Sequence, residues 1–538
     1  MSNWLDHLII VPVLLPLLAG AATLLLEERH RRTKAVINLA STVALLVVAV
    51  ALLERVRTEP ISVYLLGNWP APFGIVLVAD HLAALMLTLT GALGLAALLF
   101  ALARWHRAGL HFHALFQFML MGLNGAFLTG DLFNLFVFFE VLLAASYGLV
   151  LHGSGTARVK AGLHYIAINL AASLLFLIGV ALIYGAAGTL NMADLATRVP
   201  ALAAADRPLL QAGAAILGIA FLVKAAAWPL CFWLPTTYAA ASPPVAALLA
   251  ITSKVGVYVI LRLWLLLFGE HSGASAQLGG DWLLYLGLAT LLYGAIGVLG
   301  SQDLARLGGY SVLISSGTLL AAISVADPAV TAGALFYLIS SPLAVSAFFL
   351  LVGRAERARL AGANILAVTL EAFGDPDDEL PIEDEEVGVA IPATMALVGL
   401  SFIGCGLLLA GLPPLSGFVA KFAILSALLG GPGDSVSITA WLLLAALILS
   451  GLFTIIAMTR SGVRTFWAPL DRSVPRVRLI EMAPIAGLLF LCVLLTVRAG
   501  SVMGYLQTTA EALHAPQAYV QGVLSMPPTT VSGREASS

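Results

Sequence analysis

Residues 130–150, GDLFNLFVFFEVLLAASYGLV, contain an acid at the start, Asp131, and then an apolar run that is long enough to cross a membrane and is interrupted by one further acid, Glu140. If a helix begins near Asp131, the nine residues that follow put Glu140 about 14 Å deep, close to the middle of a ~30 Å hydrocarbon core. An ionised side chain at that depth opposes insertion. The rest of the sequence must therefore explain why it is there.

The composition is that of an integral membrane protein. Of 538 residues, 60% are apolar and only 10% are charged, whereas soluble domains carry about 25% charged residues. The net charge is -2, and no nucleic-acid-binding motif appears, so we expect no nucleic-acid partner. The three cysteines lie singly in apolar runs, which excludes a disulfide framework or a cysteine metal site.

Apolar runs of about 20 residues predict an all-α, polytopic membrane protein with about fourteen transmembrane helices. Only TGD separates the fourth and fifth runs, and the twelfth is too long for one straight helix. The predicted spans are 5–26, 34–53, 76–103, 112–129, 131–152, 161–187, 209–236, 241–268, 282–300, 308–325, 329–352, 390–428, 437–460 and 482–500.

The distribution of Lys and Arg predicts the orientation, because cytoplasmic loops retain positive charge. With the N-terminus outside, the inside loops hold seventeen basic residues and the outside segments hold six. This asymmetry predicts that both termini lie outside the membrane.

Three lysines also fall within predicted spans, namely Lys224, Lys254 and Lys421. Each charge at such depth costs about 2.5–3.5 kcal/mol, so with Glu140 the four together approach the net stability of a domain. An ion pair between Glu140 and one lysine could simply lock helices together, but two lysines would still lack a carboxylate. A buried row of such groups indicates a path for protons.

Prolines interrupt the helices that carry two of these lysines. Pro229 follows Lys224 in LVKAAAWPLCFWLP (222–235), and Pro413 and Pro414 precede Lys421 in GLPPLSGFVAKF (411–422). Each proline removes a helical hydrogen bond and leaves a carbonyl free. The sequence therefore predicts that helices 7 and 12 are broken close to their lysines.

Two broken, lysine-bearing helices five spans apart indicate an internal repeat of spans 4–8 and 9–13. Because five is odd, the second copy starts on the opposite side of the membrane and the repeat is inverted. The predicted domains are helices 1–3, the first repeat, the second repeat with an acidic loop at 355–388, and the last helix with a flexible tail, at 1–111, 112–268, 282–460 and 461–538.

The acidic loop contains nine acids and no base between residues 371 and 386. It could be a solvated loop, or a surface that attracts cations or docks a partner. No haem, Walker, metalloprotease or dinucleotide motif is present, so we expect no cofactor, no bound metal and no enzyme activity. The energy for transport must come from an ion gradient or from a partner.

Several stretches resemble one known family. LTGDLFNLFVFFEVLLAASYGLVLHG (128–153), GTLNMADLA (188–196) and GLPPLSGFVAKF (411–422) are similar to the D subunits of the multisubunit Mrp-type (Pha-type) monovalent cation/proton antiporters. Those proteins are in turn similar to the antiporter-like subunits of respiratory complex I. The resemblance covers most of residues 75–460.

The resemblance implies roles, partners and location. Glu140 and Lys224 would be the family's carboxylate and lysine pair, Lys254 its bridging lysine, and Lys421 the terminal lysine of the second half-channel. The partners would be a second large antiporter-like subunit and several small membrane subunits, in the lipid bilayer of the bacterial inner (plasma) membrane. The transported ions would be protons and Na⁺ or K⁺.

One departure from the family stands in the eleventh span. Many relatives carry a histidine where this sequence reads LFYLISSPLAVS (335–346), with Ser340 and Ser341. Serine hydroxyls order water but hold no proton near neutral pH, so the link from Lys254 to Lys421 could be water-filled or could run differently. With Asp131, Asn134 and Ser416, these serines complete the candidate polar residues.

We therefore predict that Glu140, Lys224, Lys254 and Lys421 form a row that moves protons at the middle of the membrane. Two alternatives stay open. The chain could be a proton-pumping subunit of a complex I-like NADH:quinone oxidoreductase or membrane hydrogenase, or a scaffold whose charges only fix helix packing.

Overall fold

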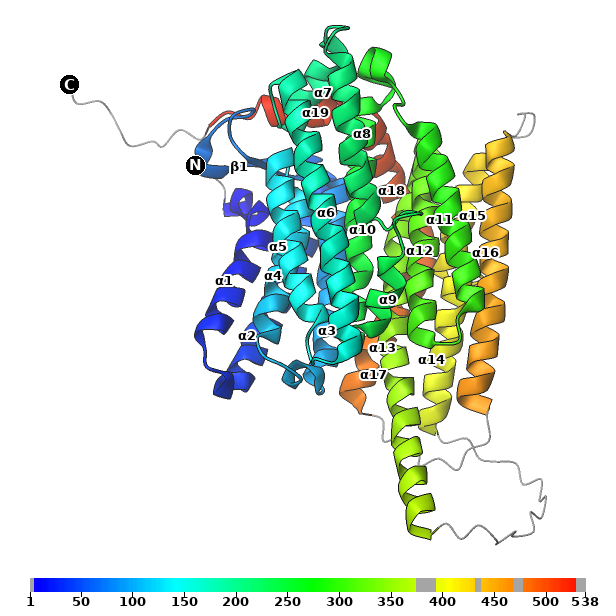
Figure 1. Cartoon of the computed structure of the whole chain (residues 1–538). Helices are drawn as coiled ribbons and strands as arrows, with labels where there is room; N and C mark the ends of the chain where they lie inside the picture. Colours follow the sequence, from blue (N-terminus) through cyan, green and yellow to red (C-terminus); the bar gives the residue numbers. More distant parts are fainter. Residues whose placement is uncertain (1–3, 374–392, 431–436, 468–477, 529–538) are drawn as a thin grey trace.

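The computed structural model describes residues 4–373, 393–430, 437–467 and 478–528. This part of the chain forms a bundle of upright helices (Figure 1). Within it, eleven apolar helices are long enough to cross a membrane. Two shorter apolar helices, α1 and α4, and the broken pair α14–α15 bring the crossing segments to fourteen. The predicted all-α architecture with about fourteen spans is confirmed.

The first three crossings are α1 (Val11–Leu25), α2 (Arg31–Thr58) and α3 (His81–Leu102). A short antiparallel hairpin, β1 (Ile61–Leu65) and β2 (Val76–Asp80), joins α2 to α3 and pairs Ile61 with Asp80. This hairpin was not predicted from the sequence, because five-residue strands beside long apolar helices carry little pattern of their own. We call the end of the bundle that carries it the hairpin end.

The first set of five crossings runs from α4 to α10 and includes a helix that is broken near its middle. The short helix α7 (Met192–Ala201) connects the third and fourth crossings at the hairpin end. The crossings are α4 (Phe112–Leu128), α5 (Leu132–Val150), α6 (Thr156–Ala187), α8 (Arg207–Lys224) followed by α9 (Trp233–Ala240), and α10 (Pro243–Phe268).

The second set has the same order, again with a broken fourth crossing. It comprises α11 (Gly280–Gly300), α12 (Leu304–Ile323), α13 (Pro328–Phe373), α14 (Ala393–Ala410) followed by α15 (Ser416–Leu429), and α16 (Ile438–Gly462). In both sets the first two helices pack together and the third packs against the broken fourth. Because five crossings separate them, the sets enter the bundle from opposite ends, which confirms the inverted arrangement.

The helices at the C-terminal end correct the prediction of a flexible tail as far as Leu524, whereas residues 529–538 of that tail lie outside the described residues. They are α17 (Leu479–Val497), α18 (Ala499–His514) and α19 (Gln517–Leu524). α19 packs against α7 and β1 at the hairpin end, and its Tyr519 and Val523 are buried. The apolar face of this short helix holds it on the bundle, although the surrounding sequence is polar.

The acidic loop predicted at 355–388 also needs correction. α13 continues to Phe373, so the first half of the predicted loop is helical. Strong helix formers in RAERARLAGANILAVTLEAF (354–373) explain the extension. Residues 374–386, which hold eight of the nine acids, lie outside the described residues.

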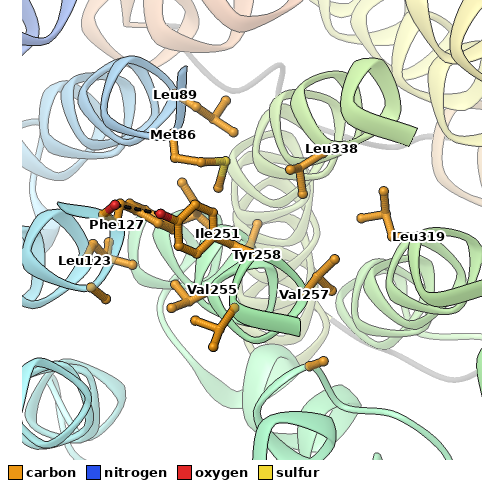
Figure 2. Packing of buried hydrophobic residues seen from close by; sticks show 14 of the residues in the cluster. Met86, Leu89, Leu123, Phe127, Ile251, Val255, Val257, Tyr258, Leu319 and Leu338 are labelled. Atoms are coloured by element: carbon orange, nitrogen blue, oxygen red, sulfur yellow. Dashed lines mark hydrogen bonds between the residues drawn. The ribbon is translucent and has the colours of Figure 1, made fainter. Parts of the chain in front are cut away.

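The central helix α10 lies between the two sets and is buried over nearly its whole length. Figure 2 shows Ile251, Val255 and Tyr258 of α10 among apolar side chains of α3, α4, α12 and α13. The Tyr258 hydroxyl donates a hydrogen bond to the carbonyl of Phe127 at 2.6 Å, drawn as a dashed line in Figure 2. Most side chains of α10 are therefore screened from lipid, and the helix as a whole contacts both sets.

The remaining short elements have one or two turns. They are the 3-10 turns Trp4–Ile9, Glu28–His30, Leu66–Asn68, Trp105–Arg107 and Glu270–Ser275, and the π-helical turn Val463–Trp467.

Candidate proton-transfer site

Lys224 is the last residue of α8, where the fourth crossing breaks. The chain resumes as a helix only at Trp233, after a cis peptide bond between Trp228 and Pro229. The backbone N–H of Trp228 leaves the helical pattern and donates to the hydroxyl of Thr290 on α11 at 2.7 Å. The helix ends before Ala225 because Pro229 has no N–H to bond the Ala225 carbonyl, four residues earlier, and its ring would clash with that carbonyl in a continuous helix.

Lys254 lies opposite this break, on the central helix. α10 approaches so closely at Gly256 that a Cβ added there would lie 2.5 Å from the backbone nitrogen of Ala225. Lys254 is 1% exposed, and its ammonium donates to the Ser316 hydroxyl of α12 at 3.1 Å. The glycine contact thus brings the helices of two predicted proton carriers, Lys224 and Lys254, together.

We expect Gly256→Ala to disturb this contact, because the added methyl group meets backbone atoms that cannot rotate away. Overpacking of this kind costs about 1–3 kcal/mol. The thermal midpoint of the purified complex should fall. Gly218→Ala, on α8, is the matched control, since a Cβ there would meet nothing within 4 Å. Equal midpoints for the two variants would show that the approach at Gly256 is not tight.

Glu140 and Lys224 are neighbours but do not touch. The Glu140 carboxylate accepts a hydrogen bond from the Ser173 hydroxyl of α6. The Lys224 ammonium lies 4.9 Å from the ring centroid of Phe139, the residue before Glu140 on α5, in a cation–π contact. Among the described residues, no direct ion pair joins the two charges, which were predicted to form a pair.

A small cavity lies beside Lys224. Its volume of about 20 Å³ is enough for a water molecule. Tyr165, Asn169 and Thr252 contribute polar atoms to its lining, together with Phe139 and Lys224 itself. Polar side chains of α6 and α10 therefore line the same cavity as Lys224.

Lys421 lies on α15, just after the second break. Its ammonium donates to the carbonyl of Ala410, the last residue of α14, at 2.9 Å. Ala410 is one of the two residues whose carbonyls Pro413 and Pro414 were expected to free. The break thus supplies an acceptor to a buried lysine, which is 6% exposed.

The other predicted polar residues divide into two groups. Asp131 and Asn134 lie at the hairpin end of α5, away from the lysines. Asp131 caps the helix by accepting from the backbone N–H of Asn134 at 2.9 Å, and the Asn134 side chain donates to the Thr129 hydroxyl at 2.9 Å. Ser340, Ser341 and Ser416 instead lie in the second set, between Lys254 and Lys421.

Backbone hydrogen bonds beside the hairpin explain the TGDLFN and GTLNMADLA motifs. The backbone N–H of Gly130 donates to the carbonyl of Val76 on β2 at 3.0 Å, and the Gly130 carbonyl accepts from Met192 N–H at 2.9 Å. The TGDLFN and GTLNMADLA stretches therefore meet beside the hairpin. There they fix the ends of α5 and α7 and do not supply groups to the lysine row.

A buried ion pair between Asp80 and Arg262 was not predicted from the sequence. Both terminal guanidinium nitrogens of Arg262 donate to the Asp80 carboxylate, one of them at 2.8 Å. The guanidinium carbon lies 5.5 Å from the ring centroid of Tyr258 and 5.3 Å from that of Tyr519 on α19. An arginine inside a predicted span was the available signal, but nothing in the sequence pointed to its partner 182 residues away.

We expect Arg262→Leu to destabilise the fold by about 3–5 kcal/mol, because it leaves the Asp80 carboxylate buried without its partner. Burial alone would raise the pKa of Asp80, but Arg262 more than offsets this and lowers it. The stabilisation is therefore complete above the ordinary carboxyl pKa and is lost as pH falls through the lower, folded-state value. Thermal unfolding in detergent measures both effects.

The control for this prediction is Arg57→Leu. Arg57 pairs with Glu54 at 3.1 Å, but the two side chains are 54% and 62% exposed, so the loss should be below about 1 kcal/mol. The double variant Asp80→Asn/Arg262→Leu should recover much of the lost stability. If Arg262→Leu unfolds no earlier than Arg57→Leu, the buried pair does not hold the hairpin end together.

No three His, Cys, Asp or Glu side chains come together as a metal site within the described ranges. Residues 129–454 match the family model described as NADH:quinone oxidoreductase/Mrp antiporter, TM, and this range contains Glu140 and all three lysines. The chain belongs to this family.

Full-length relatives of this antiporter family agree with the match. The chain is 58% identical over 536 residues to the D subunit of a probable K(+)/H(+) antiporter of Rhizobium meliloti, covering 98% of this chain and 99% of that protein. It is 33% identical over 526 residues to the D subunit of the Na(+)/H(+) antiporter of Alkalihalophilus pseudofirmus, covering 97% and 100%. The resemblance to antiporter D subunits that the sequence indicated is therefore confirmed.

The fold also matches a solved antiporter complex. A chain in the structure of the Mrp complex from Dietzia sp. DQ12-45-1b superposes with a TM-score of 0.80 at 27% identity, covering 97% of this chain and 100% of that one. The similarity to Mrp antiporter proteins thus extends over the whole bundle.

Proposed function

We propose that this chain translocates protons within a multisubunit monovalent cation/proton antiporter and so exchanges Na⁺ or K⁺ for H⁺. The observation that carries the proposal is the set of three lysines at or opposite the two helix breaks, of which Lys254 and Lys421 are buried and Lys224 is half-buried. Lys254 and Lys421 are almost completely buried, and no carboxylate lies within ion-pairing distance of either in the described part of the chain. Such costly groups are typical of a proton path and not of a scaffold.

In this proposal, Lys224, Lys254 and Lys421 take up and release the proton in turn. Glu140 acts on Lys224 through its charge, because a carboxylate near an ammonium attracts it strongly where water is scarce. Ser173 holds the carboxylate in place. The contact between α10 and the first break keeps the Lys224 and Lys254 helices together.

We propose that the chain works with a second large antiporter-like subunit and several small membrane subunits in a bacterial inner membrane. Both relatives are named as one subunit of an antiporter, which supports a multisubunit assembly. Both termini are proposed to be periplasmic. This orientation is supported by the basic residues Arg29, Arg31, Arg32, Arg104, Arg107 and Arg158, which lie in the loops or in the first helical turns at the end opposite the hairpin.

The test is exchange by the intact complex in everted vesicles. After acidification of the lumen, we expect Na⁺, K⁺ or Li⁺ to dequench a pH-sensitive dye, and the most effective cation identifies the substrate. Lys421→Ala should abolish the signal while the complex still assembles. Flavin and iron–sulfur clusters that copurify with the complex would overturn the proposal in favour of a complex I-like oxidoreductase.

A further inference from the structure

Five serine hydroxyls lie between Lys254 and Lys421, on three different helices. α12 supplies Ser315 and Ser316, α13 supplies Ser340 and Ser341, and α15 supplies Ser416. All five are buried, with exposed fractions of 7% or less. They lie where the sequence leaves open how a proton passes from Lys254 to Lys421, because the eleventh span has no histidine.

Their hydrogen bonds connect one helix to the next. Ser316 accepts from the Lys254 ammonium at 3.1 Å. The hydroxyls of Ser315 and Ser341 lie 2.7 Å apart, and so do those of Ser340 and Ser416. The contacts therefore lead from α10 through α12 and α13 to α15, the helix that carries Lys421.

This pattern differs from that of neighbouring hydroxyls. On the same helices, Ser311 and Thr318 donate to the carbonyl four residues earlier, which is the usual arrangement in an apolar helix. Ser346, on α13, donates to the carbonyl of Ala247. Each of those hydroxyls donates its proton to a backbone carbonyl and not to a second serine hydroxyl, although Ser311 also lines a cavity shared with Ser315, Ser340 and Ser341. A hydroxyl bonded to a second hydroxyl can both accept and donate.

A cavity joins the two hydroxyl pairs. Its lining includes Ser315, Ser340 and Ser341, together with Tyr337. Its volume of about 10 Å³ leaves room for about one water molecule. Such a water would lie among polar groups from both pairs, as an ordered buried water requires.

We infer that these hydroxyls relay protons between Lys254 and Lys421, an inference that rests on the proposed function. The Lys254 ammonium gives its proton to the Ser316 oxygen. Each hydroxyl binds the incoming proton on a lone pair and releases its own proton along the next hydrogen bond, so every serine ends neutral. The Lys421 amine accepts the last proton and becomes ammonium. The steps within α12, within α13 and from Ser416 to Lys421 pass through bridging water or hydroxyl rotation.

The relay can be tested at Ser341 with two substitutions of the same shape. Ser341→Thr keeps the hydroxyl, whereas Ser341→Val replaces it with a methyl group. Both variants add the same bulk, and valine also keeps water out of the space. We expect Ser341→Val to lower exchange by about 10²-fold, the lower range for loss of a proton-transfer group. Ser341→Thr should stay within about threefold of the natural chain.

Exchange is measured in everted vesicles and normalised to the amount of assembled complex. Ser346→Ala, which removes a buried hydroxyl of the same helix outside the relay, should leave exchange unchanged. Equal activities for Ser341→Val and Ser341→Thr, whether high or low, would overturn the relay, because the hydroxyl would then be irrelevant.

The same assay separates the relay from the proposed function. If Lys254→Met and Lys421→Met abolish exchange while Ser341→Val does not, the lysines carry protons by another route and only the relay fails. If both lysine variants exchange normally, the proposed function itself fails.

Discussion

Lys254→Met should reduce cation/proton exchange by at least about 10²-fold, with little change in the amount of assembled complex. Proton-transfer groups contribute about 10²–10⁴-fold to the rates that they support. Lys254 is 1% exposed and lies on the central helix between the two sets. Methionine has a similar length and no charge, so it fills the same space. The helix should therefore remain packed while the proton carrier is lost.

Lys254→Arg separates proton transfer from charge. Arginine keeps the positive charge but does not release its proton in proteins. We expect this variant to be as inactive as Lys254→Met in the vesicle assay. Lys160→Met, at an exposed lysine near the start of α6, is the matched control and should be fully active. An active Lys254→Arg would mean that a fixed charge suffices and that no proton resides on Lys254.

The positions of the charged groups and helix breaks could be predicted because both are costly in a membrane. Four charged residues lie within apolar runs, and packing alone does not explain why all of them are there. They are Glu140, Lys224, Lys254 and Lys421. Prolines beside two of the lysines predicted free carbonyls, and the Lys421 ammonium does donate to Ala410. These features are local, so one sequence is enough to reveal them.

The partners of these groups could not be predicted, because they come from distant parts of the chain. Ser173 lies 33 residues from Glu140, and Ser316 lies 62 residues from Lys254. Many serines in apolar helices bond only to their own backbone, so the sequence does not show which ones face a charge. The burial of α19 also depends on distant contacts, with α7 and β1.

The lysines of the row have different neighbours in the two halves of the bundle. Lys224 has a carboxylate nearby on α5, whereas Lys254 and Lys421 donate to a hydroxyl and a carbonyl. In the described chain, Glu140 is therefore the negative charge associated with the row, and it acts at one end. A substitution of Glu140 therefore affects proton transfer at Lys224 directly, and it affects proton transfer at Lys421 only through Lys254.

Glu140→Ala should for this reason abolish exchange, by about 10²-fold or more, while the complex still assembles. Removing the carboxylate takes away the negative charge that attracts the Lys224 ammonium. The cation–π contact between Lys224 and the Phe139 ring remains. The Ser173 hydroxyl also donates to the carbonyl of Asn169 at 3.1 Å, so it stays bonded and the fold should tolerate the change. Dequenching in everted vesicles, normalised to complex content, measures the loss.

Further substitutions at this site show whether position or charge matters. Glu140→Asp keeps the charge but withdraws the carboxylate by about one methylene from Ser173, and it should retain partial exchange. Ser173→Ala should weaken exchange less than Glu140→Ala, because it frees the carboxylate without removing it. Glu270→Ala, at an exposed acid beyond α10, should have no effect. Normal exchange in Glu140→Ala would remove Glu140 from the proton path and leave the three lysines to act without a fixed carboxylate.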